Sequence, residues 1–130
     1  MTLSKKDILT ADDLKHEVVA VPEWGGDVNV RGMTGAERDK FESGIVEQRG
    51  KQQSMNMANI RAKLASFTIC DDDGKRLFTE QDVQALSQKS AAALQRIFAV
   101  AQRLSRIGDD DVMELAGEMA ENPTDDLPTD

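Results

Sequence analysis

The sequence has little of what would brace a fold covalently or anchor it in a membrane. Among its 130 residues there are one cysteine, three prolines, one tryptophan and no tyrosine. Because Cys70 is alone, no intramolecular disulfide is possible. No stretch approaches the roughly twenty apolar residues that span a bilayer, and the first residues lack the apolar run of a signal peptide. These absences predict a soluble, intracellular protein that does not act at a membrane.

Basic residues are also scarce. The 16 lysines and arginines are outnumbered by 24 aspartates and glutamates, which gives a net charge of -8. A protein that binds duplex nucleic acid needs a net basic surface to neutralise phosphates. The balance therefore argues against a nucleic-acid partner and favours basic ones.

Catalytic motifs are missing too. There is no glycine-rich phosphate loop, no zinc-ligand spacing and no paired-carboxylate motif. Three aspartates follow Cys70 and disfavour its thiolate, whereas reactive cysteines need electropositive surroundings. His16, the only histidine, is far from Cys70 in sequence and is interpreted as structural. We therefore expect no enzyme, no cofactor and no catalytic residue.

The acidic turn at residues 71–74 could suggest a calcium loop. With Gly74 at position six, Asp71 and Glu80 would fall at ligand positions three and twelve. Position one would then be Ile69, which cannot ligate, and the usually apolar position eight would be Arg76. A solvated Asp-Gly turn without a metal is the better prediction.

One region stands out among the features that are present. Apolar and polar residues alternate over residues 16–21 and 27–33, on either side of Gly25 and Gly26, which predicts a β-hairpin. Thr34 and Glu37 then have the Thr-x-x-Glu spacing of a capping box, so a helix should begin there.

Helical periodicity dominates the rest of the chain. Helices are expected at residues 35–48, 55–67 and 79–86, and another should open at Ser90 and stop at Gly108. A last helix is expected after Gly108 and a short helical turn at residues 4–9. A single helix over residues 35–67 is the alternative to two. Residues 69–70 and 76–78 could form a minimal ladder across the acidic turn.

Together these elements predict an α+β fold that is mainly α. An N-terminal β-hairpin is followed by four to five helices in a single domain over residues 1–120. Residues 121–130 hold four acids and two prolines but one large apolar residue. Such a segment cannot offset its chain entropy by burial, so it should be a disordered acidic tail.

The candidate contact residues are either large and apolar or arginines. Methionine suits surfaces that accept varied apolar helices, and a tryptophan at a hairpin turn is hard to bury fully. For the methionines, ordinary core filling is the alternative to partner binding. The arginines share one face of the helix after Ser90 with Lys89 and Arg106, and for them the alternative is a face that contacts only solvent. The candidates for partner binding are Trp24, Met55, Met57, Arg96, Arg103, Met113 and Met119.

Several segments in a fixed order resemble the tail assembly chaperones of long-tailed, lambdoid-type bacteriophages. No one of them is a chemical signature, so the resemblance rests on their order. They are Ala11-Asp12-Asp13, Val19-Ala20-Val21-Pro22-Glu23-Trp24, Val30-Arg31-Gly32-Met33-Thr34-Gly35-Ala36-Glu37-Arg38, Arg61-Ala62-Lys63-Leu64, Asp73-Gly74-Lys75-Arg76-Leu77-Phe78, Gln88-Lys89-Ser90-Ala91-Ala92-Ala93-Leu94 and Ala101-Gln102-Arg103-Leu104-Ser105.

The resemblance implies a non-catalytic protein of the infected host cytoplasm that is absent from the mature virion. It would bind the phage tape measure protein and keep it soluble while the tail tube assembles, with homo-oligomers possible. A longer product of programmed frameshifting would reach the tail tube protein. The alternatives are a structural head–tail joining or minor tail protein, and an acidic regulatory protein or inhibitor.

Overall fold

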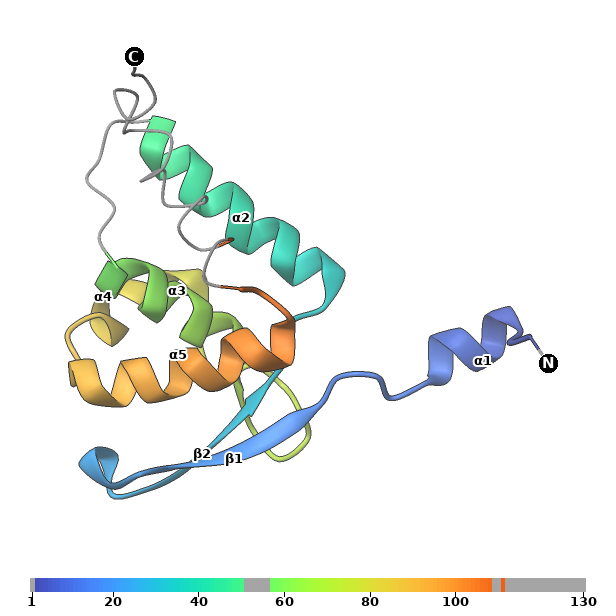
Figure 1. Ribbon diagram of the computed structural model, residues 1–130, viewed down its shortest axis with the longest axis horizontal. Helices are drawn as coiled ribbons and strands as arrows, with labels where there is room; N and C mark the ends of the chain where they lie inside the picture. The colour runs from blue at the N-terminus through green and yellow to red at the C-terminus, as the bar shows by residue number, and fades with distance from the viewer. Residues whose placement is uncertain (1, 51–56, 109–110, 112–130) are drawn as a thin grey trace, which may run out of the picture.

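The computed structural model describes residues 2–50, 57–108 and 111, and its fold is α+β and mainly α, as predicted (Figure 1). Four α-helices follow the hairpin within this described part. In chain order the elements are α1 (Lys5–Thr10), β1 (His16–Val21), η1 (Pro22–Trp24), β2 (Gly26–Arg31), α2 (Gly35–Gly50), α3 (Met57–Thr68), β3 (Ile69–Cys70), η2 (Glu80–Asp82), α4 (Val83–Leu86) and α5 (Ala91–Ser105).

The predicted hairpin is confirmed, with a different turn. β1 and β2 pair antiparallel, with His16 opposite Arg31 and Val21 opposite Gly26. Gly26 therefore belongs to the strand, and the turn is the single 3-10 turn η1, closed by Gly25 in the left-handed conformation at φ 81°. A glycine adopts that conformation without steric cost, which explains the glycine at this position.

The extended segment expected at residues 69–70 is present as β3, but its pairing with the hairpin was not predicted. Ile69 and Cys70 pair with Val30 and Asn29 of β2, so the sheet order is β1-β2-β3. The predicted ladder across the acidic turn is reduced to one bridge, Cys70 to Arg76. Two residues are too short to show the alternation by which a strand is recognised.

The junction between β2 and α2 is built on Arg31. Its guanidinium is buried and forms two hydrogen bonds of 2.8 and 2.9 Å to the carboxylate of Glu37. The Glu37 carboxylate also accepts a hydrogen bond from Thr34 N–H, and the Thr34 hydroxyl accepts one from Glu37 N–H. These two bonds confirm the predicted capping box. A third bond, from Arg31 Nε to the Gly74 carbonyl at 2.8 Å, ties the acidic turn to the same point.

Close backbone approach explains the glycine of this junction. A Cβ on Gly32 would lie 2.8 Å from the Leu104 carbonyl oxygen of α5, closer than atoms of a real side chain come. The end of β2 thus lies directly against the end of α5. Ser105 reinforces this contact by accepting a hydrogen bond from Met33 N–H at 3.3 Å.

The core lies between the sheet and the helices. α2 and α3 are two helices, as predicted, and Phe41 of α2 meets Phe67 of α3 edge-on at 6.3 Å. α5 packs on α3 and on both long strands, and Figure 1 shows it alongside the hairpin. Its predicted apolar stripe is confirmed by the buried side chains Leu94, Ile97, Phe98 and Ala101 and the partly buried Leu104.

The predicted stop of α5 at Gly108 was wrong. The helix ends at Ser105, and Arg106 takes the left-handed capping conformation at φ 59°. Ile107, which follows, is buried against the core, and this contact holds the early exit in place. The expected last helix and acidic tail fall on residues 109–130, of which only Asp111 lies within the described residues.

The chain before β1 forms an arm that projects from the domain (Figure 1). α1 begins at the capping box of Ser4 and Asp7 and buries none of its residues. The helical turn expected at residues 4–9 is thus confirmed. Residues 11–15 link it to β1.

Candidate docking groove beside Trp24

The neighbours of Trp24 in the chain fix its place at the hairpin tip. Trp24 ends η1, where Gly25 N–H donates to the Pro22 carbonyl at 3.0 Å and closes the turn. The neighbouring Glu23 accepts two hydrogen bonds from Arg96 of α5, at 2.9 and 3.0 Å. This paired geometry lowers the pKa of Glu23 to about 2. The fork of the guanidinium therefore fastens the tip to α5 and fixes where the indole lies.

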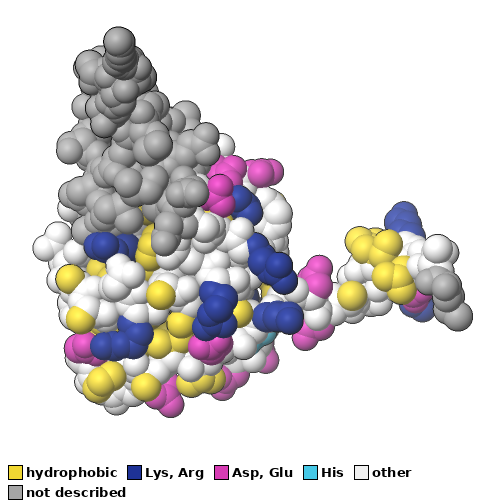
Figure 2. Space-filling model, in the orientation of Figure 1, with side chains coloured by type: hydrophobic (Ala, Val, Ile, Leu, Met, Phe, Trp, Pro, Cys, Tyr) yellow, Lys and Arg dark blue, Asp and Glu magenta, His cyan; other side chains and the backbone are white. Residues whose placement is uncertain are grey.

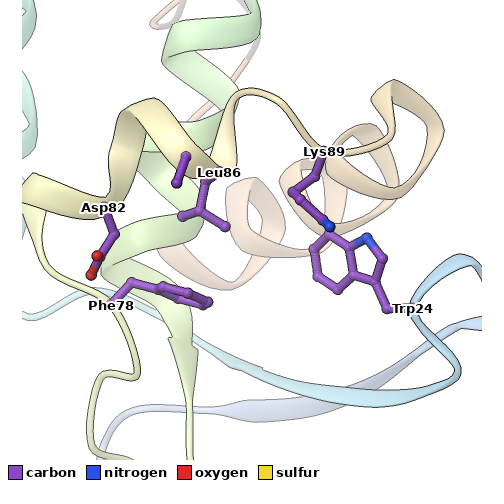
Figure 3. Close-up of a pocket in the computed structure, with 6 residues that line it drawn as sticks. Trp24, Phe78, Asp82, Leu86 and Lys89 are labelled. Carbon is purple, nitrogen blue, oxygen red and sulfur yellow. The ribbon is translucent and has the colours of Figure 1, made fainter.

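The half-buried indole borders an apolar hollow of about 240 Å³. Figure 3 shows Trp24 and Lys89 at one end and Phe78, Leu86 and Asp82 toward the other. The walls come from three separate parts of the chain: the hairpin tip, the loop before η2, and α4 with the turn after it. Only the fold brings them together.

A second hollow of about 390 Å³ adjoins the first and shares Trp24 and Phe78 with it. We call the two together the Trp24 groove. Its apolar lining is Val18, Trp24, Val28, Ile69, Leu77, Phe78, Ala85 and Leu86. The β3 strand pairs only with Asn29 and Val30 of β2, so the sheet narrows beside Val28 and the hollow opens there.

Among residues 2–45, 59–108 and 111, large apolar side chains are exposed at only two places. Val18 and Leu77 lie in the Trp24 groove, and Leu3, Ile8 and Leu9 lie on the N-terminal arm, each between 57% and 72% exposed. Figure 2 shows the apolar side chains of the arm gathered on its surface. Contiguous exposed apolar surface of this kind marks interaction sites in soluble proteins.

The charge around the groove is mostly negative. Asp27, Asp72 and Asp82 line it, against one cation, Lys89. The Asp82 carboxylate caps η2 by accepting from Thr79 N–H at 2.8 Å, so its position is fixed. An apolar floor with acidic edges fits an apolar segment flanked by lysine or arginine.

The structure places the predicted contact residues differently from one another. Trp24 lines the groove. Arg96 and Arg103 lie on one face of α5, as predicted, but they pair within the chain, with Glu23 and, at 2.8 Å, with Glu17. Of the methionines, Met57 begins α3, while the other three, Met55, Met113 and Met119, lie outside the described residues.

His16 and Cys70 lie together, although they are far apart in sequence. The pairing of β1, β2 and β3 brings His16 Nδ1 to 4.0 Å from Cys70 Sγ. Burial raises the pKa of the Cys70 thiol, and the thiol donates to the Asn29 carbonyl at 3.6 Å. A buried thiol of raised pKa is not an activated nucleophile.

The acidic turn is closed on itself. Asp71 Oδ1 accepts from the backbone N–H groups of Asp73 and Lys75 at 2.8 and 2.9 Å, and Gly74 is left-handed at φ 85°. These bonds hold the pKa of Asp71 below its ordinary value. Within residues 2–50, 57–108 and 111, no cluster of His, Cys, Asp or Glu could hold a metal ion, and no helix is long and apolar enough to cross a membrane.

Most of the groove cannot be predicted from the sequence. The sequence places Leu77, Phe78 and Leu86 in short local elements, and nothing in their spacing connects them to Trp24. The available signal was weak: two large apolar residues, Leu77 and Phe78, directly after a charged turn.

Comparisons with known proteins agree with this fold. The family model described as phage tail assembly chaperone matches residues 5–121. Among solved structures, the tail assembly chaperone of bacteriophage HK97 aligns with a TM-score of 0.54 and 21% sequence identity, over 80% of this chain and 95% of that one. A search of the curated proteins found no match. The family match covers nearly the whole chain, arm and groove included, and the chain therefore belongs to the phage tail assembly chaperones.

Proposed function

We propose that this chaperone binds the tape measure protein of its phage in the host cytoplasm, keeps it soluble until the tail tube assembles around it, and is left out of the virion. The observation that carries the proposal is the Trp24 groove, an apolar docking surface with acidic edges on a member of a tail assembly chaperone family. The role is one of binding, without a chemical step.

The chemistry of the groove suggests which part of a client it takes. A long helical protein exposes apolar stripes until its own partners cover them, and an amphipathic helix lies with that stripe in an apolar groove. Acidic edges at Asp27, Asp72 and Asp82 favour stripes flanked by lysine or arginine. Many copies on one extended client would add avidity, so each contact can be weak.

Co-expression with the tape measure protein of the same genome tests the proposal. Val18 and Leu77 are exposed, so the double variant Val18→Asp/Leu77→Asp should fold while placing charge in the groove. We expect wild type to keep the tape measure protein in the soluble fraction and the double variant to lose most of that effect. Ala36→Asp, at an exposed site on the first turn of α2, is the control and should act as wild type. Equal client solubility with wild type, the double variant and Ala36→Asp would show that the groove is not the client site.

The predicted methionines offer a competing surface. Met55→Glu/Met57→Glu in the same co-expression separates the two: a loss of client solubility with this variant alone would move the client site to the methionine-bearing helices.

Mass spectrometry of purified virions tests whether the protein is left out of the virion, since a head–tail joining protein would be found there and a chaperone would not. A slippery heptanucleotide near the end of the coding DNA would support a longer product that reaches the tail tube protein.

A further inference from the structure

We propose that the Trp24 groove has a second occupant, the α1 arm of another copy of this chain. The inference rests on the proposed function in treating the groove as a docking surface. It goes further by stating what covers the groove before a client arrives. The exposed apolar side chains of the arm and those of the groove would then cover each other.

The arm has the chemistry that the groove fits. Lys5, Ile8 and Leu9 recur at three- and four-residue steps, so they share one face of α1. Lys6 lies beside them, and the one acid of the helix, Asp7, is engaged in the capping box with Ser4. The arm thus presents an apolar pair flanked by lysines, the pattern that the acidic edges favour.

The position of the arm favours exchange between copies. Figure 1 shows α1 extending from one end of the hairpin, while η1 and Trp24 form the other end. An arm that turned back along its own β1 would meet only the Val18 end of the groove, because five extended residues span about 17 Å and Trp24 lies beyond six strand residues. The arm of a second copy can approach the whole groove, the Trp24 end included.

The chain provides its own probe of this contact. Trp24 is the only tryptophan and there is no tyrosine, so ultraviolet emission above the phenylalanine range comes from the groove itself. Docking of α1 removes water from the indole and shifts its emission to shorter wavelength. As the full-length protein is concentrated, we expect this shift to rise together with the mass measured by sedimentation.

A complementation experiment tests exchange between copies. Ile8→Asp/Leu9→Asp removes the apolar face of the arm, and Val18→Asp/Leu77→Asp blocks the groove. We expect each variant alone to associate at least about tenfold more weakly than wild type. Mixed, they should form a one-to-one complex, because one copy keeps its groove and the other its arm. Ala36→Asp is the control and should associate as wild type does.

The outcomes separate this inference from the proposed function. If the two variants stay monomeric when mixed, or if the arm variant keeps the wild-type mass, the inference is wrong. A concentration-independent blue shift that the arm variant loses would show docking within one chain and would also overturn it. Client solubility is a separate readout: the arm variant should hold the tape measure protein at least as well as wild type, since its groove is free. Complementation without any groove effect on client solubility would instead refute the client site.

Discussion

Arg31 and Glu37 show how single residues hold this fold together. The Arg31 side chain is 6% exposed and that of Glu37 18% exposed, and their paired hydrogen bonds join the end of β2 to the first turn of α2. Burial alone would raise the pKa of Glu37, but its bonds to Arg31 and to the Thr34 backbone outweigh it, and the pKa is lowered. The charge of Glu37 is therefore needed to satisfy a buried guanidinium.

Glu37→Gln should destabilise the domain by about 2–3 kcal/mol, because Arg31 would stay buried without a counter-charge. Glutamine can still form the capping box, so the loss reports the ion pair. The matched control is Glu42→Gln on the same helix, whose pair with Arg38 is more than one-third exposed and should contribute less than about 0.5 kcal/mol. Urea unfolding of both variants measures the difference. Equal losses would contradict the central role given to Arg31.

At the scale of elements, the hairpin tip depends on its ion pair with α5. The two hydrogen bonds from Arg96 lower the pKa of Glu23 from its ordinary 4.5 to about 2. A group with a lowered folded-state pKa stabilises the fold above its unfolded pKa and loses that contribution as pH falls through the folded one. The tip should therefore be held fully above about pH 4.5 and released between there and pH 2.

This pH dependence can be isolated with Glu23→Gln, which resembles protonated glutamate. The melting temperature of wild type should exceed that of the variant by a constant margin from neutral pH to about pH 5, and the margin should vanish toward pH 2. Other carboxylates of lowered pKa, such as Asp7 and Asp71, titrate in both proteins and cancel. A margin that does not change with pH would contradict the assigned contact.

The elements also show what the sequence can and cannot reveal. The long helices and the hairpin were predictable because their apolar residues repeat with a regular period, as Leu94, Ile97, Phe98 and Ala101 do on α5. The pairing of β3 with β2 was not predictable, since two residues carry no period that would name their partner strand. The end of α5 was misplaced because burial of Ile107 decides it against the nearby glycine.

The candidate site, too, could be predicted from the sequence only in part. Trp24 could be predicted as a contact residue because a tryptophan at a turn is notable by itself. The walls around it could not, since Val18, Phe78 and Leu86 come from distant segments that meet only through the pairing of β3 and the packing of α4. The ion pairs of Arg96 and Arg103 depend equally on where the hairpin lies against α5.

At the scale of the whole molecule, the same chain presents a groove with acidic edges and an arm with lysines beside an apolar pair. In our account the arm of a second copy covers the groove until an amphipathic client segment displaces it. The net charge of -8 favours basic partners and keeps free copies apart, so self-association should remain weak enough to be reversed.

Emission of Trp24 during titration with purified tape measure segments tests the central claim most directly. We predict a saturable shift to shorter wavelength for wild type and Ala36→Asp, and none for Val18→Asp/Leu77→Asp. Sedimentation in parallel reports whether the segment is bound. Binding of the segment with unchanged Trp24 emission, or with equal strength to the groove variant, would show that the client lies elsewhere on the chaperone.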